Sequence, residues 1–277
     1  MHGIYLFIIN TNILVAVASF SLYKVSDFLF GFNNFYLGCF VFFSTLFAYN
    51  YMRLPLIFKN ENNNLKSIWL QKNKFLIYLI LLISGFSSIY LCFFLGNGFF
   101  QFTMPAIIVS FLYPINFNIN RKQFILRDIP LLKLLLIAFT WSYITLIVPV
   151  LYFNIEIDLF VVSSFFQRML FVAAISIPFD IKDSQWDSIR TLPNTIGVNL
   201  SKFFAFSCLL VFDILLIINF INNDINLDYF IAVLLIIELS AVIIYYSNTK
   251  RSFVFYGILV DSLPIIMYIF IIIASMI

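Results

Sequence analysis

The chain has 277 residues, of which 63% are hydrophobic and only 10% are charged, and its formal net charge is +3. Soluble globular domains are about half apolar and about a quarter charged, so this composition excludes an ordinary soluble protein. A chain this apolar needs lipid as its solvent. We therefore predict an all-α, polytopic membrane bundle of about nine transmembrane helices, integral to an inner or plasma membrane.

The predicted spans follow from runs of roughly 20 apolar residues, the length that crosses a bilayer as a helix. The second and fourth are short, but an open strand cannot satisfy its backbone in lipid, so both are predicted as helices. The first stretch has no basic segment before it and no small-residue cleavage site, which indicates a retained helix. The spans cover about 3–22, 35–51, 75–95, 99–115, 132–152, 159–178, 203–221, 229–247 and 254–275.

The loops between these spans alternate in charge. Fourteen of the 16 basic residues fall in the segments 52–74, 116–133 and 179–202 and in the last loop, with Lys250 and Arg251. The opposite loops carry mainly acids. The positive-inside rule predicts a cytoplasmic amino terminus and a carboxyl terminus on the far side.

Short loops favour a single transmembrane domain over residues 1–277. Two long polar loops follow the second and sixth spans, four helices apart. This spacing predicts an internal repeat of two four-helix units, over about 1–115 and 132–247.

Histidine and cysteine chemistry has little support. His2 is the only histidine, which excludes a multi-histidine metal site. Cys39, Cys92 and Cys208 are scattered and show neither metal-binding spacing nor a disulfide framework.

Three aspartates follow the sixth span at spacings of three and four: Asp180, Asp183 and Asp187. If the helix continues past the membrane edge, the three carboxylates lie on one face. Mg²⁺ is usually held by one or two carboxylates together with substrate phosphate oxygens. With Lys182 and Arg190 nearby, the segment reads as a Mg²⁺–diphosphate site, the alternative being a solvated helix of mixed charge.

The same segment carries a family resemblance. Asp183-x-x-x-Asp187, preceded by Asp180 and followed by Arg190–Pro193 and Gly197, resembles the second aspartate motif of the UbiA-type intramembrane prenyltransferases. Nine helices with large loops after helices two and six are similar to that family as well. The segment with Tyr113, Pro114, Arg121 and Lys122 resembles the family's stretch after helix four, where basic residues meet diphosphate.

The chain departs from the family's first aspartate motif. Asn50 matches the leading Asn, but every aspartate of that motif is missing, and Arg53 stands in the same stretch. Arg binds phosphate in a bidentate fork, so Arg53 is one replacement for the lost metal site. Loss of catalysis explains the departure equally well.

The resemblance implies transfer of a prenyl group from an allylic diphosphate to an acceptor, often an aromatic one, with Mg²⁺ as cofactor and the bilayer as surroundings. It involves no nucleic acid. Asp183 and Asp187 would act catalytically by holding Mg²⁺, and Asp180 would be a third ligand or would orient Lys182. The expected substrate-binding residues are Asn50, Arg53, Tyr113, Arg121, Lys122, Lys182 and Arg190.

Two other functions stay open. A non-catalytic membrane protein that binds an isoprenoid or a quinone fits the missing first motif. A secondary transporter fits less well, because transporters place their charged groups near the membrane midplane rather than at its rim.

Ionisable residues also occur inside the predicted spans. They are Arg168, Asp213, Glu238 and Asp261. Such residues are functional candidates by default, but we expect structural pairing, with Asp261 and Arg168 as one pair.

Overall fold

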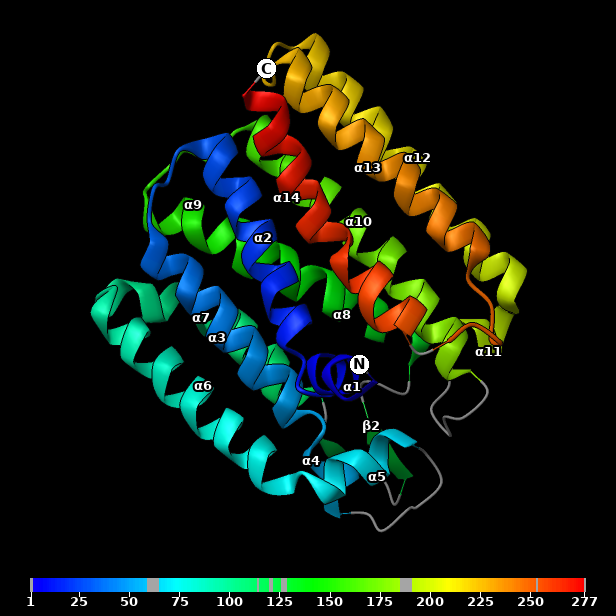
Figure 1. Ribbon diagram of the computed structural model, residues 1–277. Coiled ribbons are helices and arrows are strands. Elements are labelled where there is room, and N and C mark those ends of the chain that lie inside the picture. Colours follow the sequence, from blue (N-terminus) through cyan, green and yellow to red (C-terminus); the bar gives the residue numbers. More distant parts are fainter. Residues whose placement is uncertain are drawn as a thin grey trace.

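The structure is a computed structural model that describes residues 2–58, 65–113, 115–119, 122–125, 129–184, 191–252 and 254–276. It is a helical bundle, as predicted (Figure 1). The first half comprises α1 (His2–Asn10), α2 (Ile13–Phe30), α3 (Phe35–Tyr51), α4 (Leu54–Phe58), α5 (Leu65–Lys72), α6 (Lys74–Phe94), α7 (Asn97–Leu112), β1 (Asn116–Ile119) and β2 (Lys122–Ile125). The second half comprises α8 (Pro130–Ser142), η2 (Tyr143–Ile147), α9 (Val148–Tyr152), α10 (Leu159–Asp183), α11 (Leu192–Ile196), α12 (Val198–Ile221), α13 (Leu227–Tyr246), η3 (Phe255–Val260) and α14 (Asp261–Ser275).

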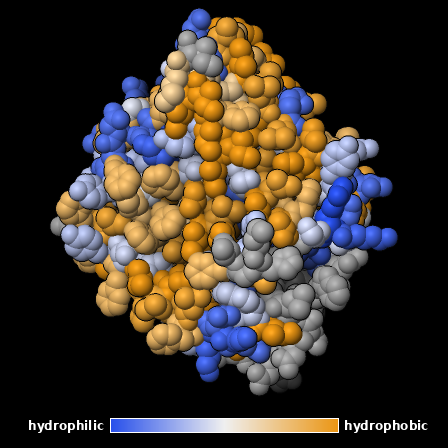
Figure 2. Space-filling view, viewed as in Figure 1, coloured by the Kyte–Doolittle hydropathy of each residue, from blue (hydrophilic) through white to orange (hydrophobic). Residues whose placement is uncertain are grey.

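The described residues contain seven helices that are long and apolar enough to cross a membrane. Two shorter apolar helices, α3 and α7, match the second and fourth predicted spans. The polytopic membrane bundle is therefore confirmed. Figure 2 shows the corresponding surface, on which hydrophobic side chains cover the centre of the visible face and hydrophilic ones gather towards its edges.

The first predicted span has the wrong bounds. The chain breaks after α1, where Asn12 adopts a left-handed conformation with φ 59°, and the long helix α2 then continues to Phe30. Lys24 and Asp27, three residues apart, form an ion pair on one face of α2, which lets the helix carry two charges near its end. The sequence prediction ended the span at these charges.

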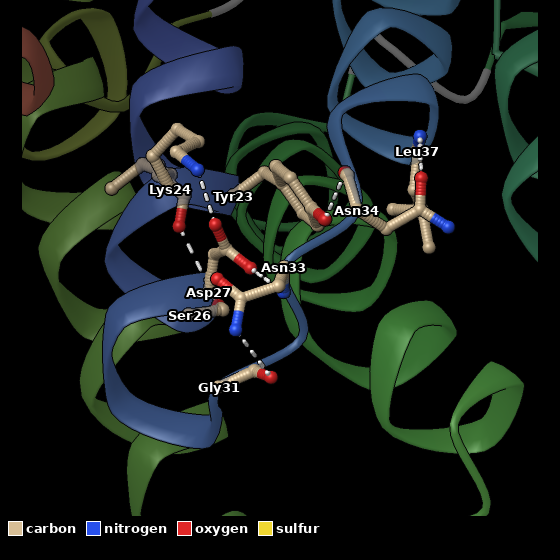
Figure 3. A network of polar contacts seen from close by, with 9 residues as sticks. Tyr23, Lys24, Ser26, Asp27, Gly31, Asn33, Asn34 and Leu37 are labelled. Carbon is tan, nitrogen blue, oxygen red and sulfur yellow. Dashed lines mark hydrogen bonds and ion pairs between the residues drawn. The ribbon is translucent and has the colours of Figure 1, made fainter.

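The turn between α2 and α3 is held by its own polar groups (Figure 3). Asp27 accepts the backbone N–H of Asn33, and the Tyr23 hydroxyl donates to the Asn34 carbonyl at 2.6 Å. The Asn34 side chain then caps α3 by accepting from Leu37 N at 3.1 Å. These contacts join residues of the turn and of the two helix ends that it connects.

The fifth span contains a π-helical turn, η2, between α8 and α9. The Thr145 carbonyl in this turn accepts from the Arg168 guanidinium at 3.1 Å and from the Ser26 hydroxyl at 2.8 Å. Arg168 also donates to the hydroxyls of Thr145 and Ser26. Asp261 acts electrostatically on Arg53 and Lys182 instead, so the expected pair of Arg168 with Asp261 is wrong.

Two large core clusters fill the bundle, and a small third one, with Ile57, Leu70 and Ile77, lies under α4 and α5. The larger is built mainly from α10, α12, α13 and α14, and α10 packs most extensively against α12 and α8. The smaller lies among α2, α3, α7 and the η2–α9 region. Nothing in this arrangement tests the predicted repeat of four helices, which stays a prediction.

The short elements gather at one end of the bundle. In Figure 1, α4, α5, α11 and the β1–β2 hairpin lie at the lower end, as does the connection from α13 to α14. The hairpin pairs Asn116 with Ile125 and was not predicted. The carboxyl terminus lies at the opposite end. We call the end with α4, α5 and α11 the basic-loop end, because its segments hold most of the basic residues.

Candidate functional site

A cavity of about 660 Å³ lies between α3, α6, α7 and α8. This volume falls within the range of about 300–1,000 Å³ that is usual for small-molecule sites. Aromatic and aliphatic side chains form most of the wall, including Phe40, Phe47, Phe93, Phe100 and Phe111. The cavity is therefore suited to an apolar ligand.

The hydroxyl groups in the wall do not make it polar, because helix carbonyls already bind them. Ser88 donates to Ser84 O at 2.7 Å, Thr103 to Phe100 O at 2.9 Å, and Thr140 to Leu136 O at 2.7 Å. At these three positions a ligand therefore meets methyl and methylene groups rather than free donors.

The cavity is long. Its wall on α3 runs from Phe40 to just beyond the helix at Met52, a distance of about 18 Å at 1.5 Å per residue. On the opposite side it runs from Phe100 to Tyr113, which follows the last residue of α7. Met52 and Tyr113 both lead into the basic-loop segments, so the cavity reaches the basic-loop end.

Aromatic groups join the cavity to this end. The Trp141 indole N–H donates to the Tyr49 hydroxyl at 3.0 Å, and the two rings meet edge to face. Tyr113 lines the same cavity, and its predicted substrate-binding role stays a prediction. Tyr49 interacts electrostatically with Arg53 and Asp261 as well as with Tyr113.

Four charged side chains interact electrostatically with one another near Tyr49: Arg53, Lys182, Asp183 and Asp261. Arg53 interacts with Asp261 and Asp183, and Lys182 interacts with the same two carboxylates and with Arg53. The Lys182 ammonium also lies 5.5 Å from the Tyr256 ring centroid. We call these four residues the mouth cluster. Burial lowers the pKa of Arg53 to about 10, with the two carboxylates acting in the opposite direction, so its guanidinium is charged at neutral pH.

Asp180 has a different partner from the one expected. Its buried carboxylate forms an ion pair with Lys133 at 2.6 Å and thereby ties α10 to α8. Asp183 lies one turn further along α10, is less buried, and belongs to the mouth cluster. The two aspartates are thus near in sequence but engaged in different interactions.

Asn50 and Arg53 hold the break between α1 and α2. The Asn50 amide donates to Thr11 O at 2.9 Å and accepts from the Asn12 amide at 3.2 Å. Arg53 donates to Asn10 O at 2.9 Å. In the described structure, both residues therefore bind backbone and side-chain groups of the amino-terminal segment.

The remaining predicted residues are only partly placed. Lys122 lies in strand β2. Arg121, Asp187 and Arg190 fall outside the described residues. Sequence reasoning did not assign Tyr49 or Lys133 to the site. The only sequence signal for Asp261 is its place as an ionisable residue within a predicted span.

A divalent metal fits this end of the bundle only in part. No group of three or more His, Cys, Asp or Glu side chains in the described ranges is arranged to hold a metal. Mg²⁺ needs only one or two protein carboxylates when substrate phosphates complete its coordination. Asp183 can supply one of these, whereas the stretch after α3 supplies Asn50 and Arg53 and no carboxylate. The residues fit one ion rather than two.

Two solved structures share this fold. A UbiA homolog from Archaeoglobus fulgidus bound to GPP and Mg²⁺ is 14% identical, with a TM-score of 0.65 over 97% of this chain and 100% of that chain. A structure described as digeranylgeranylglyceryl phosphate synthase in membranes is 15% identical, with a TM-score of 0.57 over 99% and 97%. No protein-family model and no curated protein matches the chain. The chain therefore has the fold of UbiA-type intramembrane prenyltransferases.

Proposed function

We propose that the protein transfers a prenyl group from an allylic diphosphate to an acceptor, an aromatic one by analogy with the family, at the membrane. The observation that carries this proposal is the long apolar cavity whose wall includes Tyr49, a residue that also interacts with Arg53 and Asp261 of the mouth cluster. A prenyl diphosphate has the same division, with an apolar tail and an anionic head. The shared fold with a protein that binds GPP and Mg²⁺ supports the assignment.

The cavity residues have simple roles in this proposal. The tail lies along α3 and α7, where contacts with Phe40, Phe100 and Phe111 replace its contacts with lipid. Enclosure also keeps water from the reacting carbon, which protects an allylic cation from hydrolysis. Tyr49 and Trp141, which join the cavity to the mouth cluster, present ring faces and edges that stabilise positive charge.

The mouth cluster has the complementary role. Lys182 and Arg53 attract the diphosphate, and Asp183 and Asp261 partly balance the charge of these two cations. A bound Mg²⁺ would neutralise charge on the leaving diphosphate, and Asp183 would hold it, with Asp187 as the second ligand that the sequence predicts. Arg121, Lys122, Arg190, Asn50 and Tyr113 stay predicted substrate contacts. Because Lys133 holds Asp180, we assign no metal to Asp180.

One observation favours a second function, namely binding of an isoprenoid or a quinone without turnover. Asn50 and Arg53 occupy the position of the family's first motif but bind the segment around Thr11 and Asn12. A site that lost one set of metal ligands in this way retains its cavity and its affinity for an isoprenoid tail.

The deciding experiment uses purified protein in phospholipid vesicles with labelled allylic diphosphates, Mg²⁺ and a pool of aromatic acceptors. We expect label transfer that falls about 100-fold or more in Asp183→Asn, because one metal contact is worth several kcal/mol in the transition state. Asp224→Asn, in the exposed turn after α12, is the matched control and should keep full activity.

The outcomes separate the two functions. Equal transfer by wild type and Asp183→Asn would contradict the assigned role of Asp183. No transfer by either protein, together with saturable binding of an isoprenoid lipid, would support the non-catalytic function. Chelation of Mg²⁺ should abolish transfer but leave isoprenoid binding in place.

We also propose that the basic-loop end faces the cytoplasm, which is the side that the positive-inside rule gives. In sealed right-side-out vesicles, a protease added outside should then spare Lys250 and Arg251. Cleavage at these residues without opening the vesicles would reverse the orientation.

A further inference from the structure

Two acidic residues lie on the outer surface of the bundle within the membrane-spanning region. The helices that carry them, α12 and α13, pack side by side at its edge (Figure 1). Glu238 on α13 is exposed, and Asp213 on α12 is partly buried. Their surroundings on this face are apolar and exposed: Leu210, Ile214, Ile217, Leu235 and Val242.

Both acids lie near the middle of the bilayer. Asp213 is eight residues before the end of α12 at Ile221, and Glu238 is 11 residues after the start of α13 at Leu227. At 1.5 Å per residue, they lie about 12 and 16 Å from the same end of the bundle. The hydrocarbon core is about 30 Å thick, so the headgroup region is too far away for either carboxylate to reach.

The two acids receive no compensation within the described chain. The Glu238 charge acts on Asp213, so the pair is close enough to repel when both are ionised. Asp213 Oδ1 is shielded from solvent and has no hydrogen-bond partner in the described structure. The ion pairs of this part of the chain involve other residues.

Two uncompensated carboxylates are unfavourable on a surface that contacts only lipid. Ionisable groups in spanning helices almost always face the interior of a bundle or a water-filled space, and they pair there. Arg168 follows this rule, because it is buried and bound by Ser26 and Thr145. Asp213 and Glu238 depart from it, which indicates a cationic partner outside the chain.

We propose that the exposed face of α12 and α13 binds a transmembrane helix of another protein, which places a Lys or Arg near the bilayer centre between Asp213 and Glu238. The apolar side chains around the acids pack against the same helix. This interaction does not depend on the proposed enzymatic function.

A second copy of this chain does not supply the required cation. The basic side chains of the described spanning helices are paired, buried, at the mouth or near helix ends. They are Lys24, Lys74, Lys133, Arg168, Lys182 and Lys202. None offers a lipid-facing positive charge at the depth of Asp213, so the partner has a different sequence.

The test uses the full purified chain in phosphatidylcholine vesicles with a synthetic poly-leucine transmembrane peptide. The peptide carries one central Lys and a photoreactive leucine beside it. We expect it to cross-link about 5- to 30-fold more than a peptide with Leu in place of the Lys, in line with polar contacts between membrane helices. Mass spectrometry should place the cross-links on α12 and α13.

Variants then locate the interaction. The double substitution Asp213→Asn with Glu238→Gln should lower cross-linking of the Lys peptide to the level of the Leu peptide. Asp224→Asn with Asp228→Asn removes two exposed acids, one in the turn between the two helices and one in the first turn of α13, and should keep the preference. Thermal unfolding of both variants in detergent confirms that each is folded.

Three results would overturn the proposal. Equal cross-linking of the Lys and Leu peptides to wild type would show that the acids recruit no cation. A preference that survives the Asp213 and Glu238 substitutions would place the contact elsewhere. Co-purification of differently tagged copies of this chain, lost in the double variant, would make the occupant a second copy.

Discussion

Helix α6 beside the cavity and helix α10 in the larger core differ in how much of each is buried. Around the cavity, α6 is only 22% buried over its most apolar window, whereas α10 in the other half is 56% buried. Small residues occur in both. Gly85 and Ser88 border the cavity, while Ala174 and Ala205 are fully buried between helices in the larger core. Small residues thus leave space beside the cavity, where the facing helices are apart. In the larger core they allow the helices to approach closely.

The largest expected effect concerns the ion pair between α8 and α10. Asp180→Leu leaves the Lys133 ammonium without its partner between α8 and α10, and we expect a loss of about 3–5 kcal/mol in unfolding free energy. Adding Lys133→Met should restore much of this loss, because both charges are then gone. Unfolding in mixed micelles measures both values. An Asp180→Leu variant as stable as wild type would show that the pair does not join the helices.

A matched pair of substitutions compares the larger core with the cavity wall. Ala205→Phe overpacks the larger core and should destabilise the protein by about 1–3 kcal/mol. Ser110→Phe adds the same ring to the cavity wall and should change stability by less than about 0.5 kcal/mol. It should also shorten the longest prenyl diphosphate that binds. Equal destabilisation would mean that the cavity does not tolerate an added ring.

A smaller effect is expected where the amino-terminal helix is attached. Asn50→Ala removes the groups that bind Thr11 O and Asn12, and leaving them unsatisfied should cost about 1–2 kcal/mol. Limited proteolysis should then cleave between α1 and α2 faster than in wild type. Asn194→Ala, at an exposed position in α11, is the control. Unchanged cleavage would show that other contacts suffice to hold α1.

The smallest effect concerns the cavity wall. Trp141→Phe keeps the aromatic contact with Tyr49 but removes the indole donor, and a single hydrogen bond contributes about 0.5–1.5 kcal/mol. We expect a shift of this size in unfolding free energy and a larger relative change in prenyl transfer. A variant with unchanged transfer would remove Trp141 from the proposed reaction.

The sequence predicted the bundle well because hydropathy and loop charge depend only on local residues. Its error at the first span came from Lys24 and Asp27, whose mutual pairing makes two charges tolerable in a helix. Sequence patterns could not predict the partners of Asp180 and Asn50, because Lys133 and Thr11 are 47 and 39 positions away along the chain. Spacing places residues on a helix face, but only the packing of helices decides what that face contacts.

The mouth cluster has a consequence for how ligands arrive. Its two cations and two carboxylates cancel in formal charge, so beyond a Debye length of about 8 Å they produce little net field. Long-range attraction of an anion must then come from basic residues elsewhere at the same end, such as Lys250 and Arg251. Added salt should accordingly slow the capture of a diphosphate while barely changing how long it stays.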